Sequence, residues 1–219
     1  MSKRLRLIQT FFLCAFLVSS FSGCLKKDNK EETNVGGGGT FTGSDLNGTF
    51  NSQCISSSGR ISGELYFKDT LTIAGGNSFT YRRYSFTSSL CNYGSVGLAA
   101  WTSSGTFSVG GLVSGSLQSV TFTITSFNVQ PSNGGTAWFN DTNNVNGCGS
   151  FTVGVTRDLY SNTCVINSLY TPNPANSIAQ NVMSFSSGTI SIGTPTEGAP
   201  GVFVTQGQAL PTSTSISLQ

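Results

Sequence analysis

The segment SVTFTIT, residues 119–125, decides the fold class of this chain. Its apolar side chains alternate with Ser and Thr, and a period of two places successive side chains on opposite faces of a β-strand. Turn signals rich in Gly and Asn separate such runs, and outside the N-terminal segment only residues 176–183 show a weak helical pattern. The sequence therefore predicts an all-β domain of eight or nine strands. The same alternation recurs at residues 78–81, 151–155 and 189–192.

Two of these runs change phase internally. In residues 81–84, two tyrosines straddle Arg82-Arg83, and in residues 124–127 an Ile and a Phe straddle Thr-Ser. A one-residue slip turns every following side chain to the other face, so we expect a β-bulge at both places. Bulges bend strands, and bent strands are used by closed sheets. We therefore predict a single antiparallel β-barrel of about eight strands, with a β-sandwich as the alternative.

The N-terminal segment has the pattern of a bacterial export signal. Basic residues precede an apolar run from Leu7 to Phe21, which is too short and wrongly flanked to span a membrane. The run ends in Phe21-Ser22-Gly23-Cys24, which resembles the lipobox of bacterial lipoproteins. This resemblance implies that Cys24 is lipidated and becomes the first residue after cleavage. An ordinary soluble export signal is the alternative.

The residue after Cys24 bears on the destination of the protein. Leu25 stands where the inner-membrane retention signal of lipoproteins would have Asp. The resemblance therefore implies anchoring in the outer membrane of the cell envelope, by acyl chains alone.

The rest of the chain divides by composition. Residues 1–23 form the signal peptide, residues 24–39 the lipidated cysteine and a flexible tether with four glycines, residues 40–206 the β-domain, and residues 207–219 a Ser- and Thr-rich tail. Three of the 11 basic residues leave with the signal, so 8 basic and 9 acidic residues remain and the net charge becomes −1. Only five basic residues lie in the domain, without the clustered stripe that nucleic-acid binding requires.

Four cysteines remain for an oxidising compartment: Cys54, Cys91, Cys148 and Cys164. An even count predicts two disulfides, with three possible pairings. We favour Cys54–Cys91 and Cys148–Cys164. A zinc site is disfavoured, because the chain has neither a C-x-x-C pair nor a histidine. We expect no metal and no cofactor.

A second resemblance lies at the start of the domain. Gly48-Thr49-Phe50, followed by Cys54, resembles the Gly-x-Trp start of lipocalin-like domains, with Phe50 in the aromatic place. The strands of Phe79 and Tyr84, then Cys91 and Gly105-Thr106-Phe107, follow in the order of small exported lipoproteins with such barrels. The likeness covers about residues 46–110 and implies a barrel that binds a small apolar ligand inside. The candidate lining residues are Tyr66, Tyr81, Trp101 and Trp138.

These aromatic residues have a simpler interpretation, because an eight-stranded barrel can be filled by its own side chains. We expect Trp138-Phe139 to begin a strand. We interpret Arg82-Arg83 as charge on a strand edge, which deters aggregation.

The residue inventory disfavours catalysis. Without histidine there is no imidazole acid or base, and the few acidic residues of the domain form no motif. We therefore expect a non-enzymatic outer-membrane lipoprotein that binds a small apolar ligand or a cell-envelope component. The alternative is a structural or adhesive surface module built on a β-sandwich.

Overall fold

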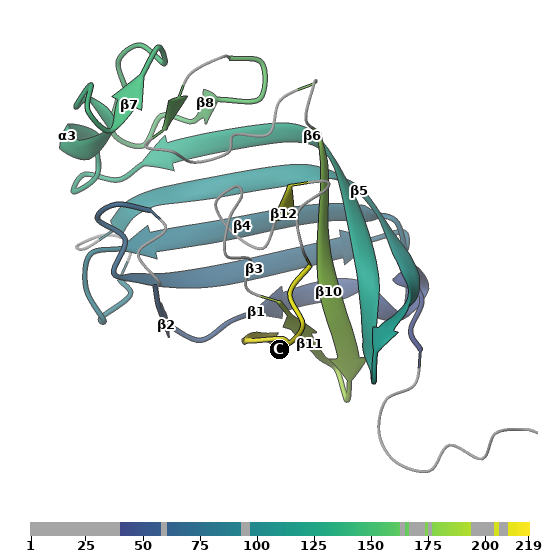
Figure 1. Cartoon of the computed structure of the whole chain (residues 1–219). Helices are drawn as coiled ribbons and strands as arrows, with labels where there is room; N and C mark the ends of the chain where they lie inside the picture. Colours follow the sequence, from purple (N-terminus) through teal and green to yellow (C-terminus); the bar gives the residue numbers. More distant parts are fainter. Residues whose placement is uncertain are drawn as a thin grey trace, which may run out of the picture. The chain divides into compact units, whose positions relative to one another are not determined.

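The computed structural model describes residues 40–57, 61–92, 97–162, 165–166, 174, 177–193, 204–205 and 210–219. Eight strands form the main sheet, each antiparallel to its neighbours (Figure 1). In sheet order they are β1 (Gly48–Asn51), β3 (Tyr66–Ala74), β4 (Ser78–Phe86), β5 (Gly97–Ser114), β6 (Leu117–Pro131), β10 (Ile178–Ser186), β11 (Thr189–Ile192) and β13 (Ile216–Leu218).

Shorter elements flank this sheet. Three of them add to it: β2 (Ile55–Ser56) pairs with β3, β8 (Arg157–Asp158) with β6, and β12 (Val204–Thr205) with β10. A separate ribbon joins β7 (Val145–Asn146) to β9 (Val165–Ile166). Within the described residues, the helical turns are η1 (Gly43–Leu46), before β1, and α3 (Thr136–Phe139), after β6.

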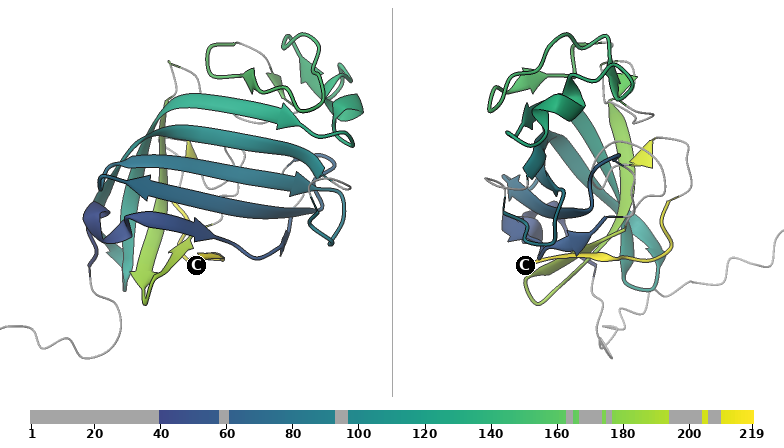
Figure 2. Two further views of the ribbon diagram at one scale, coloured as in Figure 1. Left: turned by 180° about the vertical axis from the view of Figure 1, so that it is seen from behind. Right: turned by 90° about the vertical axis from the view of Figure 1, so that its left-hand side faces the viewer.

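The sheet closes between its first and last strands. The backbone N–H of Asn51 donates to the carbonyl oxygen of Gln219 at 2.7 Å, and the N–H of Gln219 donates back at 2.9 Å. Because the eight strands follow one another around the sheet in chain order, the result is a nearly closed up-and-down barrel (Figure 2). The prediction of an all-β barrel is confirmed, and the β-sandwich is not the fold.

The C-terminal segment is a correction to the predicted organisation. Residues 207–219 were expected to form a tail, yet their last part is β13, which pairs with β11. Ile216 and Leu218 are buried in the barrel, whereas Ser217 between them is exposed. Two apolar side chains in a Ser- and Thr-rich segment are thus enough to form the closing strand.

One predicted bulge is present and the other is not. Ser104 and Gly105 on β5 face Ser126 and Ile124 on β6, so Thr125 is the extra residue, as predicted. Gly105 fits this bulge because any Cβ there would overlap the carbonyl oxygen of Thr123. The expected bulge at Arg82-Arg83 is wrong, because β3 and β4 pair without interruption through both residues.

Three local predictions are also wrong. Residues 151–155 form no strand: Phe151 is buried, but Gly154 adopts a φ of +70° inside a turn. The weak helical candidate at 176–183 is strand β10 from Ile178 onward. Trp138-Phe139 lies in α3 and does not begin a strand. In each case tertiary packing overrides a weak local pattern.

Two apolar clusters make up the core. The larger fills the barrel with side chains from most of its strands and from the segment before β1. The smaller cluster involves the start of β5 and the end of β6. There, Trp101, Phe127 and Phe139 pack together with the α3 region. Tyr160 packs against both clusters.

One predicted disulfide is seen complete. Cys54, after β1, is bonded to Cys91, after β4, with their Cα atoms 6.1 Å apart. Cys148 is also disulfide-bonded, but Cys164 lies outside the described residues, so the pairing Cys148–Cys164 stays a prediction. Cys24 and the lipobox also lie outside them.

Candidate functional site

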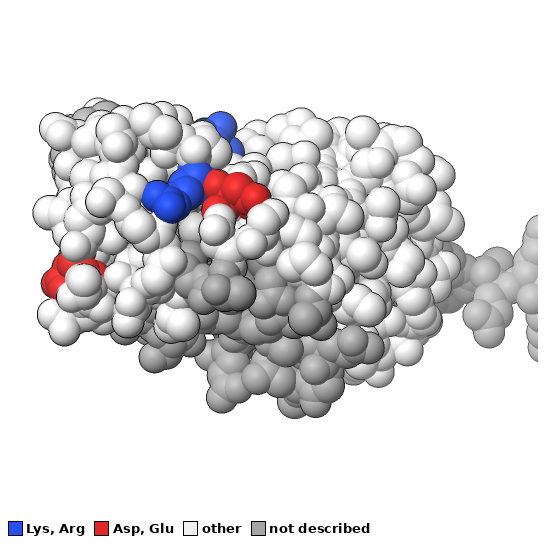
Figure 3. Space-filling view, turned by 90° about the horizontal axis from the view of Figure 1, so that it is seen from above, with Lys and Arg blue, Asp and Glu red and all other residues white. Residues whose placement is uncertain are grey.

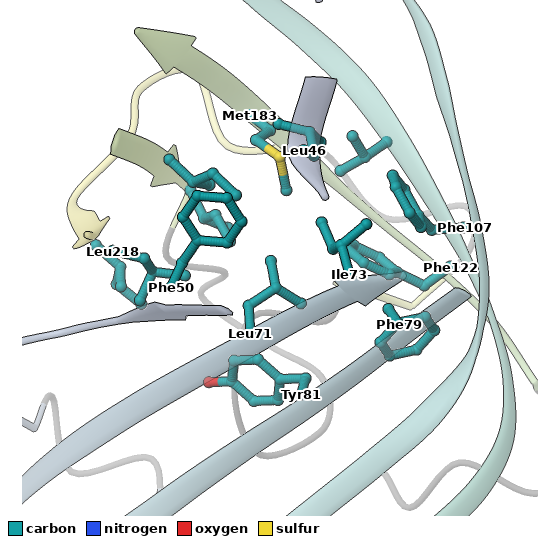
Figure 4. Close-up of a cluster of buried hydrophobic side chains, with 14 of the residues drawn as sticks. Leu46, Phe50, Leu71, Ile73, Phe79, Tyr81, Phe107, Phe122, Met183 and Leu218 are labelled. Atoms are coloured by element: carbon teal, nitrogen blue, oxygen red, sulfur yellow. The ribbon is translucent and has the colours of Figure 1, made fainter. Parts of the chain in front are cut away.

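The candidate functional site is the interior of the barrel. Alternate residues of each strand point inward and form an apolar lining (Figure 4). Phe79 and Phe107 both pack against Phe122, with ring centroids 5.0 and 6.3 Å apart. The other labelled side chains of this lining are Leu46, Phe50, Leu71, Ile73, Tyr81, Met183 and Leu218.

Toward the α3 end, the lining becomes charged. Asp69 on β3, Arg83 on β4 and Trp101 on β5 occupy one row across three neighbouring strands. The guanidinium of Arg83 donates two hydrogen bonds to the Asp69 carboxylate, from Nε to Oδ1 at 2.8 Å and from Nη2 to Oδ2 at 2.7 Å. Their side chains are 5% and 0% exposed. A bidentate pair of this kind is a strong, charge-assisted contact.

Glu64 adds a second carboxylate to this group. Its Oε1 lies 3.9 Å from Nη1 of Arg83 and accepts a hydrogen bond from Ser57 Oγ at 2.8 Å. The Ser85 hydroxyl donates to Oε2 of Glu64, and Trp101 Nε1 donates to that hydroxyl at 2.9 Å. The polar atoms are thereby connected from the indole of Trp101 to the guanidinium of Arg83. We call Glu64, Asp69, Arg83, Ser85 and Trp101 the buried polar cluster.

Burial decides the ionisation of this cluster. Desolvation raises the pKa of Glu64, and the nearby charge of Arg83 with the Ser85 and Ser57 hydrogen bonds only partly opposes it. Desolvation acts to lower the pKa of Arg83, but the Asp69 carboxylate outweighs it, so the pKa of Arg83 is raised and its charge is permanent. Burial also raises the pKa of Tyr81, which therefore stays neutral. One fixed cation thus faces two carboxyl groups, and burial makes Glu64 take up a proton more readily than a solvated glutamate does.

Arg83 also contacts the apolar lining. Its guanidinium carbon lies 3.7 Å from the ring centroid of Phe67, which is the second residue of β3 and is buried. Stacking over an aromatic face is a favourable contact for a desolvated guanidinium. The interpretation of Arg82-Arg83 as edge charge is therefore wrong for Arg83, which is buried on an interior strand. Arg82 points to the other face, where its guanidinium lies 4.7 Å from the Tyr84 ring centroid.

The four predicted ligand-binding residues do not form one site. Tyr81 and Trp101 point into the barrel from neighbouring strands, and each is 1% exposed. Tyr66 lies on β3 out of phase with the buried residues, so it faces outward. Trp138 lies on α3, half-buried against Phe139, with ring centroids 4.9 Å apart.

The alternation of the sequence places two members of the buried polar cluster at inward positions, although their charge suggested exposed positions. Asp69 is in phase with the inward-facing Phe67 and Leu71, and Arg83 is in phase with Tyr81. A charged residue at an inward position of a strand predicts a buried partner. The adjacent pair Arg82-Arg83 instead suggested a surface feature.

The outer surface carries few charges on the face seen in Figure 3. Most visible atoms there belong to uncharged residues, and one group of Lys or Arg atoms lies beside Asp or Glu atoms.

Within the described ranges, no three His, Cys, Asp or Glu residues are placed to hold a metal ion. No helix in the described part of the chain is long and apolar enough to cross a membrane. No protein-family model matches the chain, and no curated protein does either.

Proposed function

We propose that this chain is a non-enzymatic lipoprotein, anchored through Cys24 in the bacterial outer membrane, whose barrel binds a small apolar ligand in its interior. The lipobox resemblance at Phe21–Cys24 supports the anchor. The apolar lining supports the binding role, because a barrel lined by aromatic and aliphatic side chains presents an environment that apolar molecules prefer to water. The observation that carries the proposal is the convergence of this lining inside one nearly closed sheet.

The burial of the lining sets a condition on binding. Solvent barely reaches the interior side chains, since even Phe50 and Phe107 are among the buried residues. A ligand therefore has to enter by the opening of one end of the barrel, or by displacement of side chains. Entry from the end remote from the buried polar cluster disturbs no ion pair, so it is the less costly route.

A second function has its own supporting observation. Tyr81 and Trp101 are almost completely buried, which favours a barrel filled by its own side chains. Such a barrel acts through its outer face, as a structural or adhesive module of the cell envelope. This candidate keeps the lipid anchor and dispenses with the internal ligand.

The anchor is tested by metabolic labelling with palmitate. We expect label on the wild-type chain, no label on Cys24→Ser, and accumulation of the unprocessed form when the lipoprotein signal peptidase is inhibited by globomycin. Cys14→Ser is the matched control, because it changes the other cysteine of the first 24 residues and should keep the label. Absence of label from the wild type would contradict the anchor.

Ligand binding is tested by fluorescence. In the Trp138→Phe variant, Trp101 is the only tryptophan, and it reports on the interior. We expect a saturable shift of its emission on titration with a fatty acid. Phe122→Ala, inside the barrel, should change the midpoint, whereas Tyr66→Ala, on the outer face, should leave it unchanged. No saturable shift in the parent variant would rule out internal binding and favour the filled barrel.

A further inference from the structure

The hairpin between β5 and β6 exposes two consecutive aliphatic side chains near its tip. Leu112 is 54% exposed and Val113 is 51% exposed, and Leu117 across the turn is half-buried. Two register shifts, between Val109 and Leu112 and between Leu112 and Ser114, interrupt the ladder here. Other aliphatic side chains of the described chain are similarly exposed, but Leu112 and Val113 are consecutive and lie near a hairpin tip, where both can meet another apolar medium.

The start of the folded domain is fixed beside this hairpin. Leu112 pairs across the ladder with Gln118. The Gln118 amide oxygen accepts a hydrogen bond from the Phe41 backbone N–H at 2.7 Å, and its Nε2 donates to the carbonyl oxygens of Phe41 and Gly110 at 3.1 and 3.2 Å. Phe41 also packs edge-on against Phe185 of β10, at 6.3 Å between ring centroids. The chain therefore enters the domain at the level of Leu112.

The views of the barrel agree with these contacts. The first described residues, drawn in purple, lie at the same end of the sheet as the β5–β6 and β10–β11 hairpins (Figures 1 and 2). The sequence predicts a glycine-rich tether between Cys24 and Thr40, and a flexible coil of that length would span on the order of 20 Å. A lipid on Cys24 therefore holds the hairpin tip within reach of the bilayer that carries the lipid.

The β5–β6 and β10–β11 hairpins carry no charge that a membrane would have to desolvate, whereas Asp45 on η1, at the same end of the barrel, is exposed. The sequence has no Lys, Arg, Asp or Glu in residues 84–140, which include β5 and β6, nor in residues 159–196, which include β10 and β11. Burial of a charged side chain in a bilayer is costly, whereas burial of Leu and Val is favourable. Two side chains give weak binding alone, but a tethered contact is intramolecular and needs little intrinsic affinity.

We propose that the β5–β6 hairpin inserts Leu112 and Val113 into the phospholipid surface that anchors the chain. This inference rests on the lipid anchor of the proposed function. It orients the barrel, with the hairpin end at the membrane and the end that bears α3 and the Cys54–Cys91 disulfide directed away from it.

The test uses the full lipidated protein in vesicles of phosphatidylethanolamine and phosphatidylglycerol, with and without brominated acyl chains, which quench tryptophan on contact. Leu112→Trp is made in the Trp138→Phe background, so that buried Trp101 supplies a constant signal. Leu90→Trp is the matched control, because Leu90 is an exposed leucine, at 75%, in the segment between β4 and β5 at the opposite end of the strands. We expect a blue shift and a bromine-dependent loss of emission for Leu112→Trp and neither for Leu90→Trp.

The outcomes separate this inference from the anchor itself. Vesicle flotation and palmitate labelling of the wild type report the anchor independently of tryptophan. If the wild type floats with vesicles but Leu112→Trp is not quenched, or both tryptophans are quenched equally, the hairpin does not dock and the inference is wrong while the anchor stands. If the wild type carries no lipid and does not float, the anchor fails and the inference fails with it. A Leu112→Asp/Val113→Asp variant should still float, but should lose the protection of residues 110–117 from hydrogen exchange that vesicles give the wild type.

Discussion

Arg83 binds both carboxylate oxygens of Asp69 inside the barrel, and the side chains of this pair are almost entirely removed from solvent. Glu64 lies 3.9 Å from the same guanidinium. A charge buried at this depth is tolerated only with a partner. The pair therefore couples β3 to β4 in a way that no apolar contact of the lining does.

Removal of Arg83 should be strongly destabilising. Arg83→Met leaves Asp69 and Glu64 buried without a cation, and loss of one partner of a buried pair costs about 3–5 kcal/mol. We expect that decrease in the free energy of urea unfolding at pH 7. Asp69→Asn/Arg83→Met should lose less than the sum of the single variants, because the second change removes the uncompensated charge. Arg82→Met, on the half-exposed face, is the control and should change stability by less than about 1 kcal/mol.

The raised pKa of Glu64 predicts a specific pH dependence. The folded chain keeps a proton on Glu64 at pH values above 4.5, where the unfolded carboxyl loses it. Stability from this group is therefore complete below pH 4.5 and declines as pH rises through the folded pKa, with a slope of at most about 1.4 kcal/mol per pH unit. Glu64→Gln should remove this decline, since the amide can still bond Ser57 and Ser85.

Asp45 provides the contrasting case. Its pKa is lowered by the Thr42 backbone N–H and, second, by the Thr42 hydroxyl. A lowered pKa adds stability that is complete above the ordinary value of 3.8 and is lost as pH falls through the folded pKa, so the destabilisation of Asp45→Asn should be largest above pH 3.8 and shrink as pH falls further. Unfolding curves from pH 3 to pH 8 for both variants measure the two opposite slopes. Parallel curves for Glu64→Gln and the wild type would contradict the assignment to Glu64.

The Cys54–Cys91 disulfide should contribute substantially to stability. It closes a loop with a sequence separation of 37, for which chain-entropy arguments give about 4 kcal/mol. We expect Cys54→Ser/Cys91→Ser to lose roughly that amount in the oxidised state and still fold at low temperature. Reduction of the wild type should have a larger effect than reduction of this double variant, since the double variant has already lost this bridge. An equal response of both proteins to reductant would show that Cys54–Cys91 contributes little.

The closing strand can be tested at single residues. Leu218 is fully buried among the lining side chains, so Leu218→Ala should cost about 2–5 kcal/mol. Ser217→Ala, at the exposed position between two buried ones, should stay within about 0.5 kcal/mol of the wild type. Hydrogen exchange should show faster opening at the Asn51 amide in Leu218→Ala, because that amide is bonded to Gln219. An unchanged rate at Asn51 would mean that closure does not depend on β13 packing.

Much of the fold was predictable from local pattern. Residues 119–125 alternate cleanly and form the middle of β6, and the phase change after Ile124 marks the bulge at Thr125. These features depend on the sequence immediately around them. The Cys54–Cys91 bridge, favoured among the pairings that four cysteines allow, is also present.

Other features depend on contacts between distant residues, and local pattern did not identify them. β13 has only three residues, so its pairing is defined by β11 and β1 and not by its own alternation. Residues 151–155 alternate by chance, since Gly154 turns the chain. Arg83 looked exposed beside Arg82, because its partner Asp69 lies on another strand. For the candidate site, the sequence identified aromatic residues but not the row in which Asp69, Arg83 and Trp101 meet.

The Asn51–Gln219 seam joins the two ends of the domain and so bears on how fast the barrel can form. The hairpins between consecutive strands close short loops, whereas the seam closes a loop that contains almost the whole domain. Until β13 arrives, β1 and β11 each present an unpaired strand edge, which is a template for pairing with another chain. Because β13 ends one residue before Gln219, the sheet remains open to such encounters until the last residues of this sequence have paired.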